Sequence, residues 1–230
     1  MGMAEAGEQV GAARATIALT VRQRCFYLFC ALVLLIIAVP LYEDSAAGRI
    51  ALNILSLLIL LSGASVIGRG GGSFVISLLL AAPAGIFQVL GYASGDARYV
   101  ILSQAFAAGF YFITVSYLLL YALRPEVLTM DKLYGAAAGY LMMGVMWAYF
   151  YSLLLWIHPG ALTINGEPLI ATEPSTILYF SFVTLTATGM SDILPVAALA
   201  RILCMFEMVT GVLFIAVLIA RLATQYPPRK

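Results

Sequence analysis

The sequence predicts an all-α membrane protein with six transmembrane helices and a re-entrant helix and loop between the fifth and the sixth. The chain is 63% hydrophobic and only 10% charged, with a mean hydropathy of +1.02, whereas about 25% of the residues of a soluble domain are charged. A helix needs about 20 mainly apolar residues to cross a bilayer. Six segments meet this requirement, namely residues 24–41, 50–67, 74–91, 99–123, 130–157 and 196–223.

A seventh apolar segment, residues 174–185, is too short to span a bilayer and is expected to enter and leave on the same side. Pro174 suits an early helical position, and we expect the helix to end at Thr186. Its C-terminal carbonyls would then point towards the membrane interior, where the negative end of the helix dipole favours a cation.

The distribution of basic residues predicts the orientation. With both termini in the cytoplasm, nine lysines and arginines lie inside and three outside, which fits the positive-inside rule. The inside set is Arg14, Arg22, Arg24, Arg69, Arg124, Lys132, Arg221, Arg229 and Lys230, and the outside set is Arg49, Arg98 and Arg201. We therefore expect a multi-pass plasma-membrane protein, and the short loops favour a bacterial inner membrane.

Residues 1–23 are expected to form a cytoplasmic N-terminal segment and residues 24–124 a four-helix membrane domain. The fourth span carries no Lys or Arg between Tyr99 and Leu123, and voltage sensing requires several arginines inside the membrane. The domain is therefore not expected to sense voltage. Asn53, Gln88 and Gln104 are uncharged polar residues on these helices; we favour interhelical hydrogen bonds over a solute pathway for them.

Several function classes receive no support. The three cysteines lie in apolar helices without CxxC spacing, which favours buried thiols over a disulfide or a metal site. No nucleophile–base pair or metal-ligand cluster is evident, so we do not expect an enzyme or a cofactor. A net charge of +1 gives no reason to expect a nucleic-acid partner.

The most informative motif lies between the last two long segments. Residues 181–195 read Ser-Phe-Val-Thr-Leu-Thr-Ala-Thr-Gly-Met-Ser-Asp-Ile-Leu-Pro. This run resembles the pore helix and selectivity filter of the potassium channel family, typically Ser-Phe-Val-Thr-Leu-Thr-Thr-Val-Gly-Tyr-Gly-Asp-Ile-x-Pro. The resemblance is specific from residue 176 to residue 222 and weaker from residue 130. It implies a pore domain over residues 130–223, followed by a short cytoplasmic tail, residues 224–230.

The resemblance assigns the filter to consecutive residues that end with an aspartate. A potassium filter replaces the hydration shell of the ion with rings of backbone carbonyls, so potassium or sodium is expected at the carbonyls of four of these residues, Ala187, Thr188, Gly189 and Met190. The whole set is Thr186, Ala187, Thr188, Gly189, Met190, Ser191 and Asp192.

Three filter positions depart from the family pattern. Ala187 replaces a threonine whose hydroxyl completes the innermost ion site, and Met190 replaces a bracing aromatic residue. Ser191 replaces a glycine in a left-handed conformation, at a cost of about 1–2 kcal/mol. Tyr179 and Val183 stand where family members carry a tryptophan and a glutamate. A looser filter with reduced potassium selectivity is the resulting hypothesis.

Residues 205–222 resemble the inner helix of bacterial potassium channels. Gly211 falls at the hinge glycine of the family, with close helix packing as the alternative. We expect Ile215 and Ile219 to follow Gly211 along the lumen as a hydrophobic constriction. Glu207 is a carboxylate within a span, and such a group is a functional candidate by default; it either hydrogen-bonds behind the filter or faces the cavity.

One pore segment per chain is a quarter of such a pore, so the resemblance implies a homotetramer surrounded by membrane lipids. Gating is expected from the filter, the constriction, lipid, pH or a separate regulatory subunit. The main hypothesis is a potassium-conducting cation channel. A non-selective monovalent cation channel and a non-conducting membrane subunit or sensor that retains the pore fold remain alternatives.

Overall fold

The computed structural model describes residues 24–43, 45–67, 72–123, 130–190 and 192–225. The predicted cytoplasmic segment 1–23, the last five residues of the predicted tail and the predicted filter residue Ser191 lie outside the described part of the chain.

Six described helices are long and apolar enough to cross a membrane, which confirms the predicted all-α membrane fold. Their ends lie within three residues of the predicted ends, except that α3 begins four residues before the predicted start. The helices are α2 (Arg24–Tyr42), α3 (Ala46–Ile67), α4 (Gly72–Ser94), α5 (Ala97–Leu123), α6 (Met130–Ile157) and α8 (Ala198–Gln225), with the short α7 (Pro174–Leu185) before α8.

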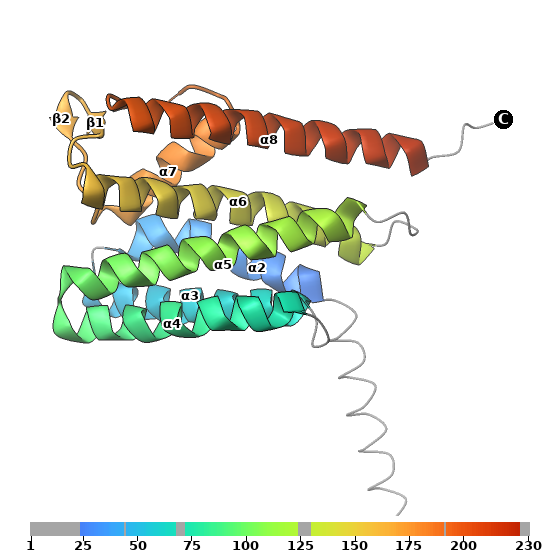
Figure 1. Ribbon diagram of the computed structural model, residues 1–230, viewed down its shortest axis with the longest axis horizontal. Helices are drawn as coiled ribbons and strands as arrows, with labels where there is room; N and C mark the ends of the chain where they lie inside the picture. Colours follow the sequence, from blue (N-terminus) through green and yellow to red (C-terminus); the bar gives the residue numbers. More distant parts are fainter. Residues whose placement is uncertain (1–23, 44, 68–71, 124–129, 191, 226–230) are drawn as a thin grey trace, which may run out of the picture.

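The long helices run roughly along one direction, and α6 lies between the N-terminal helices and the α7–α8 pair (Figure 1). Because successive spans alternate in direction, α2, α4 and α6 end, and α3, α5 and α8 begin, at the same end of the molecule. We call it the sheet end, since a small β-sheet lies there (Figure 1). The short α7 slants between α6 and α8 instead of running the length of the bundle.

The sheet forms in the segments that flank α7. Strands β1 (Leu162–Ile164), β2 (Glu167–Pro168) and β3 (Ile193–Pro195) pair antiparallel in the order β2-β1-β3. The hairpin turn is Asn165-Gly166, and both residues have positive φ, 53° and 88°, as a tight hairpin requires. Ile164 pairs with Ile193, so the chain after the predicted filter is fixed to the segment that follows α6.

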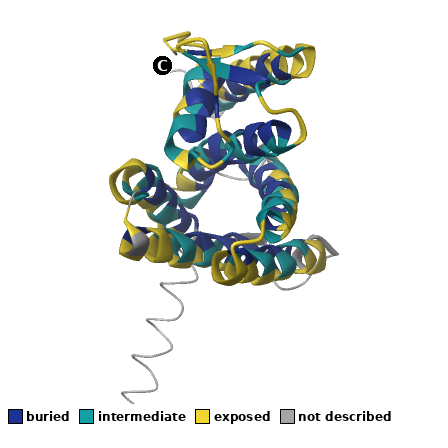
Figure 2. Ribbon diagram, turned by 90° about the vertical axis from the view of Figure 1, so that its left-hand side faces the viewer, coloured by how far each residue is buried: buried dark blue, intermediate teal, exposed yellow. Residues whose placement is uncertain are grey.

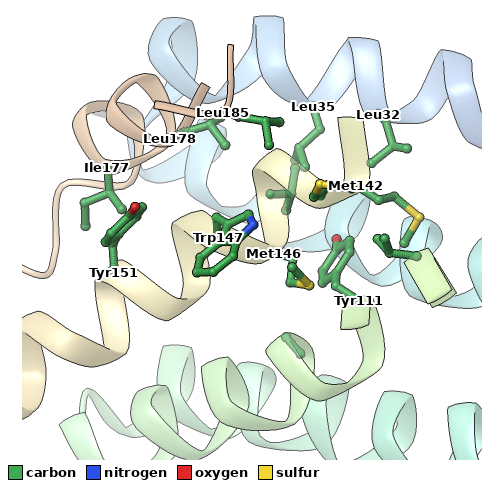
Figure 3. Packing of buried hydrophobic residues seen from close by; sticks show 14 of the residues in the cluster. Leu32, Leu35, Tyr111, Met142, Met146, Trp147, Tyr151, Ile177, Leu178 and Leu185 are labelled. Carbon is green, nitrogen blue, oxygen red and sulfur yellow. The ribbon is translucent and has the colours of Figure 1, made fainter. Parts of the chain in front are cut away.

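The buried side chains form one cluster that extends from α2 to α8, with α6 at its centre. Figure 3 shows α6 side chains packing towards α2 and α7 on one side and towards α5 on the other. Two α6 glycines permit this close packing: a Cβ on Gly135 would lie 3.2 Å from Cys25 Sγ, and one on Gly139 would lie 3.4 Å from Leu118 Cβ. Small residues therefore bring α6 against α2 and α5.

Polar side chains join α3 to α4 and α5 to α6 inside the bundle. Gln88 Nε2 donates to Asn53 Oδ1 at 2.8 Å and to Ser56 Oγ at 2.6 Å. The Ser152 hydroxyl donates to Gln104 Oε1 at 3.1 Å. These contacts confirm the interhelical hydrogen bonds predicted for the three amides.

Candidate functional site

The N-terminus of α7 is capped by Glu43, which lies at the end of α2. Glu173, the residue before the helix, makes no side-chain capping bond. Instead the Ser175 backbone N–H donates to Glu43 Oε2 at 3.0 Å, and the Ser175 hydroxyl donates to Glu43 Oε1. A carboxylate at a helix N-terminus satisfies an otherwise unpaired N–H and is favoured by the helix dipole. Glu43, at the end of α2, thus ties the four N-terminal helices to α7.

The C-terminus of α7 closes in a Schellman turn. The Ala187 N–H donates to Thr184 O at 2.9 Å, and the Thr188 N–H donates to Val183 O at 3.2 Å. Ala187 occupies the left-handed position of this motif with φ 53°, where glycine is usual. The helix ends at Thr186, as the sequence predicted. Two of its last carbonyls accept backbone N–H groups instead of facing the membrane interior unpaired.

Threonine hydroxyls add to this closure. Thr186 Oγ1 donates to Phe182 O at 2.7 Å, and Thr188 Oγ1 lies 3.3 Å from Val183 O. The two hydroxyl oxygens are themselves 3.3 Å apart. Ala187 itself has no hydroxyl, but the hydroxyls of its two neighbours Thr186 and Thr188 lie next to each other and turn back to the last turn of α7.

The following residues are exposed in the single chain. Gly189 has φ 68°, and a Cβ built there would meet no atom within 4 Å. Met190 is 80% exposed, but its backbone carbonyl accepts a hydrogen bond from the Tyr179 hydroxyl at 2.6 Å. Among the described residues none donates a hydrogen bond to the exposed carboxylate of Asp192. Tyr179 thus fixes one predicted filter carbonyl from the pore helix.

Glu207 lies at the junction of α6, α7 and α8, and it is fully buried. The Tyr151 hydroxyl donates to Glu207 Oε2 at 2.5 Å. The Ser181 Oγ is 2.6 Å from Glu207 Oε1 and 2.7 Å from Gly144 O. Of the two predicted placements, these contacts correspond to the one behind the filter, because the carboxylate joins the three helices and is enclosed by them.

Gly211 lies one turn further along α8 on the same buried stripe. A Cβ built there would lie 2.1 Å from Leu185 O, so only glycine lets α8 approach the last carbonyl of α7 this closely. The helix continues through Gly211 without interruption. This geometry corresponds to the close-packing alternative, and Gly211 faces α7 of its own chain.

Ile215 and Ile219 are 42% and 59% exposed and do not share the buried stripe of Gly211. Gly211 itself points towards Leu185 of α7, whereas the position of the two isoleucines along a lumen stays a prediction, because a single chain does not define a pore axis. The stripe of α8 that packs against α6 and α7 consists of Ala200, Cys204, Glu207, Gly211 and Phe214.

Sequence reasoning missed two contacts that hold the site. Glu43 was not singled out in the sequence, and Tyr179 was noted only as a substitution for tryptophan. The first has no local signal, since its partner lies 132 residues away. The Tyr179 contact has a signal in the predicted pore helix. Tyr179 lies in this helix, eleven positions before Met190, and it faces the chain that returns after the helix ends.

Residues 136–226 match the family model described as "Ion channel". The chain has no significant match among curated proteins or among solved structures. The matched segment contains most of α6, all of α7 and α8, and every predicted filter residue. The helix order, the short α7 between two spans and this match together support an ion channel pore module in the C-terminal part of this multi-pass membrane protein.

Proposed function

We propose that the protein is the pore-forming subunit of a homotetrameric cation channel that conducts potassium, with reduced selectivity over sodium. The observation that carries this proposal is the placement of α7. It is held at Glu43 at one end and against Gly211 at the other, so that residues 186–190 follow it at a fixed position between two spanning helices. A carbonyl-lined filter needs such a rigid support.

Four copies are proposed because one chain supplies one filter strand, whereas a filter of carbonyl rings requires four. The surface of α8 supports contact between copies, without fixing their number. Over more than half of its circumference it presents large apolar side chains that its own chain leaves exposed; among them are Met205, Phe206, Val209, Val212, Leu213, Ile215 and Ile219. In the proposed tetramer some of these side chains would pack against neighbouring copies, and others would line the pore.

Reduced selectivity follows from the local geometry of residues 187–190. The Ala187 backbone is left-handed, and the Met190 carbonyl is bonded to Tyr179. A carbonyl that accepts a hydrogen bond from behind is less available to an ion. Fewer coordinating carbonyls weaken discrimination between potassium and sodium, which keeps a non-selective monovalent cation channel as the second candidate.

The test is ion flux into proteoliposomes under separate potassium and sodium gradients, with Gly189→Asp as the blocked-filter control. We expect potassium flux to exceed sodium flux and both to vanish in the control. The Tyr179→Phe variant removes only the hydroxyl that holds Met190 O, so it should change the potassium-to-sodium ratio while preserving flux. Equal fluxes of both ions would favour the non-selective channel, and no flux in any gradient would reject conduction.

A further inference from the structure

A cavity of about 600 Å³ lies inside the bundle at the sheet end. Its walls come from α2, α3, α4, α5 and α6 and from the start of α7. Figure 2, viewed from the sheet end, shows helices surrounding a common centre with their buried residues turned inward. The volume falls within the range of about 300–1,000 Å³ typical of small-molecule sites.

Three amide side chains of the cavity lie in one layer. Asn53 and Gln104 follow the first residues of α3 and α5 by seven positions, and Gln88 precedes the end of α4 by six. At 1.5 Å per residue all three lie about 10 Å below the sheet end. Ser56 and Ser152 line the same cavity. Every member of this layer is uncharged.

The amides of this layer keep unused hydrogen-bonding atoms. Gln88 spends its Nε2 on Asn53 and Ser56, and Gln104 accepts from Ser152 through Oε1. Within the described residues, no partner is present for Asn53 Nδ2, Gln104 Nε2 or Gln88 Oε1. None of these atoms is among the buried unpaired atoms of the described chain, and all three residues line the cavity. The layer thus offers both donors and an acceptor.

The charged groups of the cavity lie at its mouth. Glu43 is engaged by Ser175, and Arg49 donates to Glu43 O at 3.4 Å. The third charged residue of the lining, Glu173, directly precedes α7. Apolar side chains line much of the remaining wall, with Leu35, Val145 and Leu178 among them. A buried charge without a partner is expensive, so this interior disfavours an ion and suits an uncharged solute.

We propose that this cavity binds a small uncharged amphiphile whose polar group is an amide or a hydroxyl. The polar group would pair with Asn53, Gln88 and Gln104, while its apolar part would lie against the walls that include Ile177 and Leu178 of α7. A two-chain lipid is too large for this volume. Binding is independent of the proposed conduction, because it requires only the intact bundle.

The experiment uses the full-length protein in lipid nanodiscs with hexanamide as the probe and hexanoate and hexylammonium as charged analogues. The chain has two tryptophans; Trp156 lines the cavity, and Trp147 packs against Phe150. A Trp147→Phe background therefore leaves Trp156 fluorescence as the reporter. We expect a saturable change with hexanamide, and at least tenfold weaker responses with both charged analogues.

Two variants locate the binding site. Gln88→Leu should weaken hexanamide binding at least tenfold. Because that variant also removes interhelical hydrogen bonds, Ala148→Phe provides an independent test by filling the cavity, and it should abolish the response. Ala105→Phe on the exposed side of α5 adds the same bulk elsewhere and should leave binding unchanged. An unsaturable response, equal binding of the charged analogues, or an undiminished response in Ala148→Phe would overturn the proposal.

Discussion

Individual residues of the site carry backbone strain and buried polarity that a helix core does not need. Ala187 adopts φ 53° at a position where a Cβ costs about 1–2 kcal/mol, and Glu207 is enclosed between three helices. Both features persist because neighbouring groups compensate: the Schellman bonds hold Ala187, and the hydroxyls of Tyr151 and Ser181 satisfy Glu207.

The Ala187→Gly variant tests the strain. Glycine removes the Cβ penalty but adds freedom to the unfolded chain, so we expect a net stabilisation of up to about 1 kcal/mol. The measurement is the unfolding temperature in detergent. Ala138→Gly inside α6 is the control, because there glycine should destabilise by about 1 kcal/mol. Destabilisation at both positions would argue against a strained Ala187.

The Glu207 network predicts different effects for two substitutions. Glu207→Gln keeps an oxygen for Tyr151 and supplies an N–H for Ser181 Oγ, so it should change thermal stability little. Glu207→Leu leaves two buried hydroxyls without this partner and should destabilise by about 1–3 kcal/mol. Thermal unfolding of both variants in detergent distinguishes them. A Leu variant as stable as the Gln variant would show that the network contributes nothing.

At the scale of elements, side chains from distant helices satisfy the ends of others. Glu43 at the end of α2 caps α7. Asp131 of α6 accepts from the Cys25 backbone N–H near the start of α2 at 3.3 Å, and Arg221 of α8 donates to Ala122 O near the end of α5 at 3.1 Å. Unpaired terminal groups of a helix need such partners where water is scarce.

The cap on α7 can be tested by a double-mutant cycle. Glu43→Ala removes both bonds and should lower stability by about 1 kcal/mol, whereas Ser175→Ala removes only the hydroxyl bond and should cost less. The double variant should lose little more than Glu43→Ala alone, because the hydroxyl has no partner once the carboxylate is gone. Thermal unfolding provides the energies. Glu167→Ala in the exposed strand β2 serves as the control for loss of a carboxylate at the sheet end. Fully additive losses would disprove the direct coupling.

The contact between α8 and α7 depends on Gly211. A methyl group there would overlap Leu185 O, so Gly211→Ala should move the end of α7 or the α8 backbone. We expect ion flux to fall at least tenfold in proteoliposomes. Val212→Ala, on the neighbouring exposed face, is the control and should retain flux. Normal flux in Gly211→Ala would mean that the end of α7 tolerates displacement.

At the scale of the whole molecule, the exposed apolar side chains of α8 need a surface to pack against. The proposed homotetramer predicts a particle of four 24.7 kDa chains by native mass spectrometry. Replacing both Val212 and Leu213 with tryptophan should reduce the tetramer, because added bulk disrupts a packed interface. Leu79→Trp on α4, where Leu79 is 66% exposed, is the control on a lipid-facing surface. A tetramer that survives the first substitution and a stable monomer in the wild type would each contradict this assembly.

The sequence by itself determined the membrane-spanning helices and the position of the pore helix. Long apolar segments predict spans because the bilayer thickness sets their length, and the 174–185 helix was predicted with both ends correct. The Asn165-Gly166 turn also carried a local hairpin signal that went unused. What only the tertiary structure decided are contacts between residues far apart: the Glu43 cap, the direction in which Gly211 faces, the Glu207 network and the polar cavity. Each depends on how helices rotate and pack against one another, and an apolar helix without a strong polar face does not encode that rotation locally.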